Sequence, residues 1–111
     1  MTDALQQKHC IACQVGTPPV SLDEVAKLKG QIDAGWEPVG GNKKIHREWK
    51  FKNFQEAMAF ANIVAEIAER EGHHPDMYIF YNRVRLELWT HAANGLTEND
   101  FIMAAKIDSL T

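Results

Sequence analysis

The feature that most constrains the fold of this chain is a long amphipathic segment over residues 54–71. Asn53 can cap its first turn, and Gly72 can take the left-handed conformation with which helices commonly end. Between them, apolar side chains recur at helical spacing in one stripe: Phe54, Ala57, Met58, Ala61, Val64, Ala65 and Ala68. Such a stripe must be covered by another apolar surface. The sequence therefore predicts a long helix that packs on the rest of a core.

Strand patterns stand on both sides of this helix and predict two hairpins. Before it, residues 36–39 and the alternating segment 43–51 flank a Gly-Gly-Asn turn. After it, the aromatic segment 77–81 is followed by a polar turn and by the alternating segment 84–91. Two hairpins supply four strands, which can pair in one sheet.

Shorter helices are predicted at both ends of this pattern. Ser21 and Glu24 form a capping box for a helix over residues 22–33, and Thr97 and Asp100 form a similar pattern for the last helix. The resulting order is α-β-β-α-β-β-α. It predicts an α+β fold, in which a four-stranded antiparallel sheet has helices packed on one face.

The first 20 residues differ from the rest. They carry a polar start, a Cys10-Ile11-Ala12-Cys13 motif and two adjacent prolines, which cannot continue a helix. We expect residues 1–20 to form either an arm laid on the domain or a frayed tail, and residues 21–111 to form the domain. The CxxC spacing could supply half of a zinc site, but no second pair completes it.

The composition suits one ordinary globular domain. The 111 residues are 45% apolar and carry a net charge of −3, which argues against general nucleic-acid binding. No apolar run approaches the roughly 20 residues that span a bilayer, and the N-terminus lacks the pattern of a signal peptide. These features predict a cytoplasmic protein without a membrane partner, whose cysteines are thiols rather than a structural disulfide.

Three histidines stand out as groups that could move protons near neutral pH. His73 and His74 follow the long helix, where the negative end of the helix dipole favours an imidazolium. Glu69 lies four residues before His73, a spacing that places a supporting carboxylate on the same helical face. His91 ends a strand and is expected to point away from the core. The pattern indicates acid–base chemistry, although solvated loop histidines or a three-histidine zinc site would use the same residues.

The spacing of these residues resembles the signature of the pterin-4a-carbinolamine dehydratase family. The run Glu69-Arg70-Glu71-Gly72-His73-His74-Pro75 is followed, at the spacing of that signature, by Tyr81, His91 and Asp100. The segments 53–57 and 95–100 are similar to its flanking segments, and the resemblance covers residues 21–108. The segment from His9 to Cys13 is similar to the arm of bacterial members that serve phenylalanine hydroxylase.

This resemblance implies an activity, a fold and a set of site residues. The implied reaction removes water from the 4a-hydroxytetrahydropterin, or 4a-carbinolamine, that an aromatic amino-acid hydroxylase leaves. It yields the quinonoid dihydropterin and uses no metal or organic cofactor. The implied fold is the same four-stranded antiparallel sheet with helices on one face. The implied catalytic residues are His73, His74 and His91, and the implied substrate-binding residues are Glu69, His74, Thr90 and Asp100.

Individual residues carry further expectations. His73 is expected to be the acid, because the nearby carboxylate and the helix end both favour its charged form. His91 would take the complementary role or serve the opposite stereoisomer, and His74 would mainly hold the pterin. Asp100 has an equally good structural explanation in the first turn of the last helix. Tyr81 and Trp89 could stack on a flat pterin, although strand aromatics more often belong to a core or an interface.

The resemblance also implies partners. We expect a pterin as the small-molecule substrate, a functional link to an aromatic amino-acid hydroxylase, and a homodimer or homotetramer, since an open sheet leaves two edges for pairing. In animals the family includes a protein that also acts as a dimerisation cofactor of a hepatocyte transcription factor. A binding role without catalysis is therefore the alternative, and the retained acid–base positions favour the enzyme.

Overall fold

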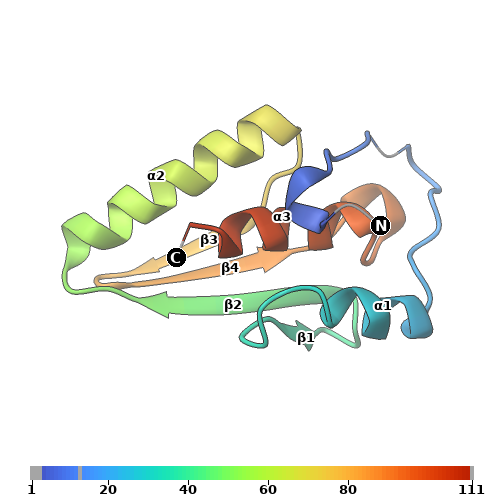
Figure 1. Cartoon of the computed structure of the whole chain (residues 1–111), viewed down its shortest axis with the longest axis horizontal. Helices are drawn as coiled ribbons and strands as arrows, with labels where there is room; N and C mark the ends of the chain where they lie inside the picture. The colour runs from blue at the N-terminus through green and yellow to red at the C-terminus, as the bar shows by residue number, and fades with distance from the viewer. Residues whose placement is uncertain (1–3, 13, 111) are drawn as a thin grey trace.

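The computed structural model describes residues 4–12 and 14–110 and builds them around a single sheet (Figure 1). In chain order its elements are η1 Leu5–Gln7, α1 Leu22–Lys29, β1 Glu37–Val39, β2 Lys44–Lys50, α2 Phe54–Glu71, β3 Asp76–Phe80, β4 Arg83–Leu88, η2 His91–Ala93 and α3 Glu98–Asp108, where η marks a short 3-10 helix. The predicted α-β-β-α-β-β-α order is confirmed. The two 3-10 helices are additions, one before α1 and one between β4 and α3.

The sheet is antiparallel throughout, and its strands lie in the order β1-β2-β4-β3. Each hairpin pairs its own two strands, and the hairpins join in the middle. There β2 and β4 pair from Ile45 opposite Leu88 to Lys50 opposite Arg83. β1 and β3 are the two edges (Figure 1). This arrangement confirms the predicted α+β fold.

The core lies between one face of the sheet and the helices. Val84, Leu86 and Leu88 of β4 are fully buried, whereas the charged residues that alternate with them are not. On the helix side, Ala57 and Val64 of α2 are fully buried as well. α2 contacts β3 and β4, and α3 contacts β4. Burial with a period of two residues means that the helices cover one sheet face and leave the other to solvent.

The ends of α2 and α3 are fixed by the residues that the sequence pattern identified. The Asn53 side chain accepts a first-turn backbone N–H at 2.9 Å, and Gly72 ends α2 with φ at 67°. Thr97 and Asp100 form a complete capping box at the start of α3. Glycine adopts the left-handed conformation without the cost that other residues incur, so the chain turns sharply away from the axis of α2.

The first helix is shorter than predicted. It stops at Lys29 and not at residue 33, because Gly30 is a poor helix former and the chain then tightens into a turn, with the Ile32 N–H donating to the Lys29 carbonyl at 3.3 Å. The next residue, Asp33, donates its N–H to the Asp108 carboxylate at 2.9 Å. The chain therefore turns out of the helix after Lys29 and contacts the end of α3.

The limits of the second hairpin differ by one to three residues from the predicted ones. Tyr81 leaves the strand predicted for 77–81 and occupies the turn between β3 and β4 with φ at 47°. β4 ends at Leu88, so His91 opens η2 instead of closing a strand. The reason is that Thr90 pairs back onto Gly95 in an isolated bridge and starts a tight loop.

The described part of the N-terminal segment lies against the domain instead of projecting from it. Leu5 is buried in the core, and η1 packs beside α3 (Figure 1). Further along, the Val20 N–H donates to the Leu96 carbonyl at 2.9 Å. Cys13, one half of the CxxC motif, lies outside the described residues. None of the helices within the described residues combines the length and the apolar character that crossing a bilayer requires.

Candidate active site

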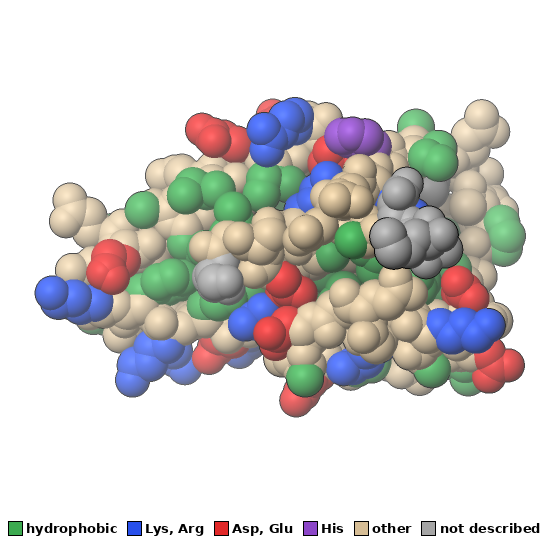
Figure 2. Space-filling model, in the orientation of Figure 1, with side chains coloured by type: hydrophobic (Ala, Val, Ile, Leu, Met, Phe, Trp, Pro, Cys, Tyr) green, Lys and Arg blue, Asp and Glu red, His purple; other side chains and the backbone are tan. Residues whose placement is uncertain are grey.

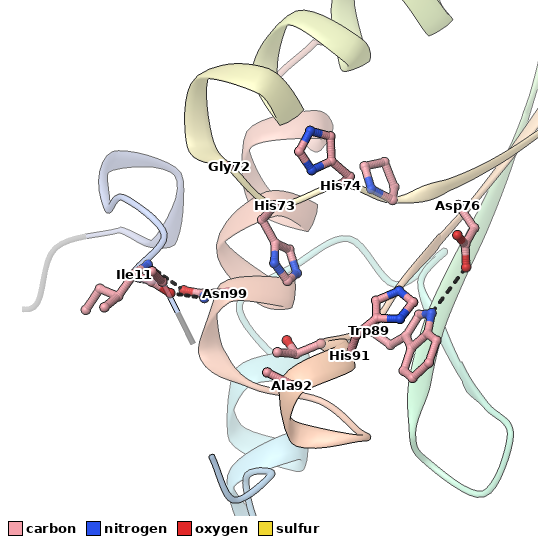
Figure 3. A pocket seen from close by; sticks show the side chains of 12 residues that line it. Ile11, Gly72, His73, His74, Asp76, Trp89, His91, Ala92 and Asn99 are labelled. Atoms are coloured by element: carbon pink, nitrogen blue, oxygen red, sulfur yellow. Dashed lines mark hydrogen bonds between the residues drawn. The ribbon is translucent and has the colours of Figure 1, made fainter. Parts of the chain in front are cut away.

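A pocket of about 340 Å³ opens where the end of α2, the start of β3, the loop after β4 and the N-terminal arm meet (Figure 3). Its lining is formed by Ile11, Ala12, Gly72, His73, His74, Pro75, Asp76, Trp89, Thr90, His91, Ala92 and Asn99. The three histidines predicted as catalytic all belong to this lining. The fold brings them together because β4 runs antiparallel to β3 and returns the chain to the end of α2.

His73 is held by a carboxylate that is itself fully buried. Its Nε2 lies 2.6 Å from Oδ1 of Asp100, whose side chain has 0% exposure. The backbone N–H of His73 donates to the Ala68 carbonyl at 3.2 Å, which fixes the chain directly after the turn. An ionised carboxylate can only accept hydrogen bonds, so Nε2 carries the proton in this pair. Nδ1 is then the ring nitrogen that remains for a ligand.

Asp100 uses its other oxygen to close the start of α3. Oδ2 accepts the Thr97 N–H at 3.0 Å and the Thr90 hydroxyl at 2.9 Å, and the two threonine hydroxyls lie 2.8 Å apart. The structural and the functional explanations of Asp100 are thus parts of one arrangement, in which one oxygen caps the helix and the other orients His73. Asp100 does not line the pocket, and the Thr90 hydroxyl is already bonded within the protein. Asp100 thus contacts the His73 ring directly, and Thr90 contacts Asp100.

The predicted pairing of Glu69 with His73 is wrong. Oε2 of Glu69 lies 2.9 Å from Nε2 of His74 instead. The left-handed Gly72 ends the helical spacing one residue before His73. The side chain that reaches Glu69 is therefore that of His74 and not that of His73. Both side chains of the observed pair are largely exposed, 79% for Glu69 and 60% for His74, so solvent screens their attraction. Glu69 lies outside the pocket lining.

His91 reaches the pocket from the opposite side and is held by an aromatic contact. Its ring centroid lies 3.8 Å from that of Trp89, with 37° between the planes. The Trp89 Nε1–H donates to the Asp76 carboxylate at 3.2 Å, and the Lys44 ammonium lies 5.0 Å from the Trp89 ring centroid. Among residues 4–12 and 14–110, neither ring nitrogen of His91 has a hydrogen-bond partner. Both nitrogens are therefore available to a ligand or to water.

The two aromatic residues considered for stacking on a pterin have different places. Trp89 lines the pocket beside His91 (Figure 3). Tyr81 lies in the turn at the other end of the β3–β4 hairpin, is 67% exposed and does not line the pocket. Only Trp89 is positioned to meet a flat ligand.

Several lining residues were not identified from the sequence. Asp76 orients Trp89, and Ile11, Ala12 and Asn99 close the side of the pocket next to the arm. A local sequence pattern carries no signal for them, because each acts through a partner far away in the chain.

The arm is attached next to His73 through the carboxylate of Glu71. Glu71 accepts the Cys10 N–H at 2.8 Å, lies 3.1 Å from Nδ1 of His9, and has the Lys106 ammonium at 3.8 Å. Burial alone would raise the pKa of the Glu71 carboxyl. The Cys10 hydrogen bond, the His9 ring and the Lys106 charge outweigh that effect and lower the pKa below its ordinary value.

Within the described residues, no three His, Cys, Asp or Glu side chains converge in a way that could hold a metal ion. Cys13 of the CxxC motif is not among those residues.

Comparison with known proteins identifies the family. Residues 18–110 match the sequence model of the pterin 4 alpha carbinolamine dehydratase family. A protein of Nitrosospira multiformis, provisionally named a pterin-4-alpha-carbinolamine dehydratase, is 49% identical over 97% of this chain and 93% of its own length. A protein of Alkaliphilus metalliredigens with the same provisional name is 44% identical over 94% of this chain and 93% of its own.

Solved structures agree with this assignment. The crystal structure of a Brucella melitensis protein, described as a transcriptional coactivator/pterin dehydratase, is 38% identical with a TM-score of 0.78, over 83% of this chain and 97% of that one. A pterin dehydratase-like protein described as a RuBisCO assembly factor in the alpha-carboxysome is 22% identical with a TM-score of 0.59, and shows the shared fold alone. The sequence match, the α+β fold and the pocket agree, and the chain belongs to the pterin-4a-carbinolamine dehydratase family of hydro-lyases.

Proposed function

We propose that this pocket removes water from a 4a-hydroxytetrahydropterin by histidine acid–base catalysis, without a metal or an organic cofactor. The observation that carries the proposal is the convergence of His73 and His91 on one pocket from two separate elements, with His73 oriented by the buried Asp100. Hydroxide leaves poorly, so the reaction needs a proton at the 4a-hydroxyl and an acceptor for a proton from the pterin nitrogen side.

His73 is the proposed acid. With Nε2–H donated to Asp100, the protonated ring carries its transferable proton on Nδ1. Transfer of that proton to the 4a-hydroxyl lets the carbon–oxygen bond break and water leave. Asp100 stabilises the imidazolium before transfer and keeps the ring orientation afterwards, so no reorganisation is needed during the step.

His91 is the proposed base. It takes the proton that the pterin loses from its nitrogen side, which completes the quinonoid dihydropterin. Because His91 is exposed and its ring nitrogens have no partner among the described residues, it can return this proton to solvent, from which His73 is recharged. The same position would allow His91 to protonate the opposite carbinolamine stereoisomer.

His74 and Trp89 are proposed to hold the substrate. His74 lines the pocket, and its Nδ1 remains available while Nε2 pairs with Glu69. Trp89 presents an indole beside His91, and a flat pterin can stack on such a surface. Thr90 and Asp100 contribute by positioning His73.

The test is a direct one. Chemically generated 4a-hydroxytetrahydropterin decays spontaneously, and we expect catalytic amounts of the protein to accelerate this decay at neutral pH. A pure binding module would leave the decay rate unchanged. Exhaustive chelation should leave the acceleration intact, and a loss of activity that zinc alone restores would refute the metal-free mechanism.

The proposed substrate is the 4a-hydroxytetrahydropterin that an aromatic amino-acid hydroxylase leaves after using its tetrahydropterin. We propose that the protein recycles the pterin of an aromatic amino-acid hydroxylase. In a coupled assay with phenylalanine hydroxylase, a limiting pterin and a reductase with NADH that returns the quinonoid dihydropterin to tetrahydropterin, the protein should raise the steady rate. An unchanged rate, with dehydratase activity present, would argue for a different source of the carbinolamine.

A homodimer or homotetramer is part of the same proposal. Both sheet edges are strands without a neighbour in the described chain, and Phe54 and Ile63 of α2 are 50% and 45% exposed. Figure 2 shows apolar side chains gathered over the region of α2. Light scattering at micromolar concentration should give at least twice the 12.6 kDa of one chain, and a monomer mass would contradict the proposal.

A further inference from the structure

Residues 9–12, the arm segment, are fastened by two side chains that the proposed mechanism does not use. The Cys10 N–H donates to Glu71 at 2.8 Å. One residue further on, the Ile11 N–H donates to Oδ1 of Asn99 at 3.0 Å, and Nδ2 of Asn99 donates to the Ile11 carbonyl at 2.6 Å. Asn99 therefore holds both backbone groups of one arm residue, as a neighbouring strand would.

Both anchors stand next to the residues that form the acid site. Glu71 ends α2 two residues before His73, and Asn99 precedes Asp100 in the first turn of α3. The arm segment thus connects the same two helix ends that the His73–Asp100 hydrogen bond connects. Figure 3 shows the paired hydrogen bonds between Ile11 and Asn99 beside the pocket.

The arm segment also forms part of the pocket surface. Ile11 and Ala12 belong to the lining, together with Asn99 itself. In Figure 3 the Ile11 side chain points away from the histidines, so this residue faces the pocket with its backbone. Without the arm segment, the pocket would be open on the side of α3.

We propose that Glu71 and Asn99 are positioning residues that hold the arm segment as a wall of the substrate pocket. The proposal rests on the proposed function, since the enclosed ligand is the pterin carbinolamine. A wall contacts the substrate and the transition state alike. Its loss therefore raises KM and leaves kcat nearly unchanged, which separates this role from proton transfer.

The first test releases the wall from the helix side. Asn99→Ala removes both hydrogen bonds to Ile11, and Glu71→Gln removes the charge that faces His9 and Lys106. We expect Asn99→Ala to raise KM about tenfold and Glu71→Gln to raise it less, with kcat within about twofold of wild type. Amide hydrogen exchange at Cys10 and Ile11 should become faster in both. The matched controls, Asn62→Ala and Glu66→Gln on the exposed side of α2, should behave as wild type.

The second test alters the wall itself and leaves its anchors intact. Ala12 is exposed and lines the pocket, so Ala12→Phe fills space without disturbing the core. We expect KM to rise by about tenfold, and Val15→Phe, on the same arm but outside the lining, to have no effect. This pair keeps the proposal testable even if Asn99→Ala fails to fold.

Binding of 7,8-dihydrobiopterin, measured by calorimetry, separates this proposal from the proposed function. If the wild type binds this probe and does not catalyse dehydration, the proposed function is wrong, and the arm is still judged by the ratio of dissociation constants. Weaker binding by Asn99→Ala and Ala12→Phe, with normal controls, supports the wall. Faster amide exchange in the arm with unchanged KM and unchanged probe binding would overturn it.

Discussion

The two sides of the pocket hold their histidines by different means. On the helix side, His73 is bonded to the fully buried Asp100, whose second oxygen is fixed by Thr90 and Thr97. On the strand side, His91 rests against Trp89 and, among residues 4–12 and 14–110, its ring nitrogens have no hydrogen-bond partner. One histidine is locked in orientation and the other is open to solvent.

This difference matches the two proton transfers of a dehydration. The proton that reaches the leaving hydroxyl must arrive at a fixed position, and a preorganised ring supplies it without reorganisation. The proton that leaves the pterin must afterwards be passed to water, and an exposed ring does this more readily than a buried one. In the proposed mechanism, the pocket thus combines a rigid proton donor with an exchangeable proton acceptor.

The largest effects on kcat are expected when His73 or His91 is removed, and they should differ between the two sides. We expect His73→Ala to lower kcat by about 10²–10⁴-fold, because no water takes the fixed place of Nδ1. His91→Ala should lower kcat by an amount near the lower end of that range, about 10²-fold, because solvent can accept a proton there. Stopped-flow decay of the carbinolamine under single-turnover conditions measures both.

Added imidazole is the control for these two variants. It should restore part of the rate of His73→Ala if the lost group transferred a proton, and circular dichroism should show an intact fold. Near-wild-type kcat in both variants, with chemistry rate-limiting, would mean that the proposed mechanism is wrong.

Much of the fold could be predicted from the sequence because its signals are local. Capping residues and period-two burial depend on neighbours a few positions apart, and Asn53, Gly72 and Thr97 act as their patterns indicated. The errors fell where a contact outside the repeating pattern ends an element. Asp108 bonds Asp33 after the shortened first helix, and the bridge from Thr90 to Gly95 ends β4 early.

The candidate site shows the same division. The three histidines of the pocket were found from spacing and resemblance, but their partners were not. Glu69 was paired with His73 on helical spacing, and one left-handed glycine reassigned that carboxylate to His74. Asn99 gave no signal at all, since its role depends on a segment 88 residues away.

Substitutions of Trp89 test the contact that holds His91 on the strand side without removing this histidine. Trp89→Leu deletes the ring against which His91 rests, and an aromatic contact of this kind contributes about 0.5–1.5 kcal/mol. We expect kcat to fall by about three- to tenfold, with a smaller fall for Trp89→Phe, which keeps a ring and loses only the hydrogen bond to Asp76. Steady-state kinetics give the comparison. An equal fall in both variants would show that the Asp76 hydrogen bond, and not the ring contact, holds His91.

On the helix side, the contribution of the Glu71 carboxylate can be measured as the pH dependence of the free energy of unfolding. Its folded pKa is lowered, so its stabilising effect is complete above the ordinary Glu pKa of about 4.3 and is lost as pH falls through the lower folded-state value. We expect Glu71→Gln to be less stable than wild type by about 1 kcal/mol at pH 7. Urea unfolding of both proteins at several pH values should show this difference shrinking with acidification. A difference that stays constant down to pH 3 would mean that the carboxylate charge contributes nothing.

The smallest effects are expected at His74, the neighbour of His73, and at its partner Glu69. His74→Ala should raise KM more than it lowers kcat, because His74 lines the pocket and is assigned to holding the pterin. Its partner Glu69 is 79% exposed, and screened surface pairs contribute little. Glu69→Gln, which keeps a side chain of the same shape, should therefore leave KM and kcat within about twofold of wild type. If Glu69→Gln instead lowered kcat as strongly as a variant of Asp100, the exposed carboxylate would be the one that serves the acid. The distinction between a buried partner for His73 and a screened partner for His74 would then fail.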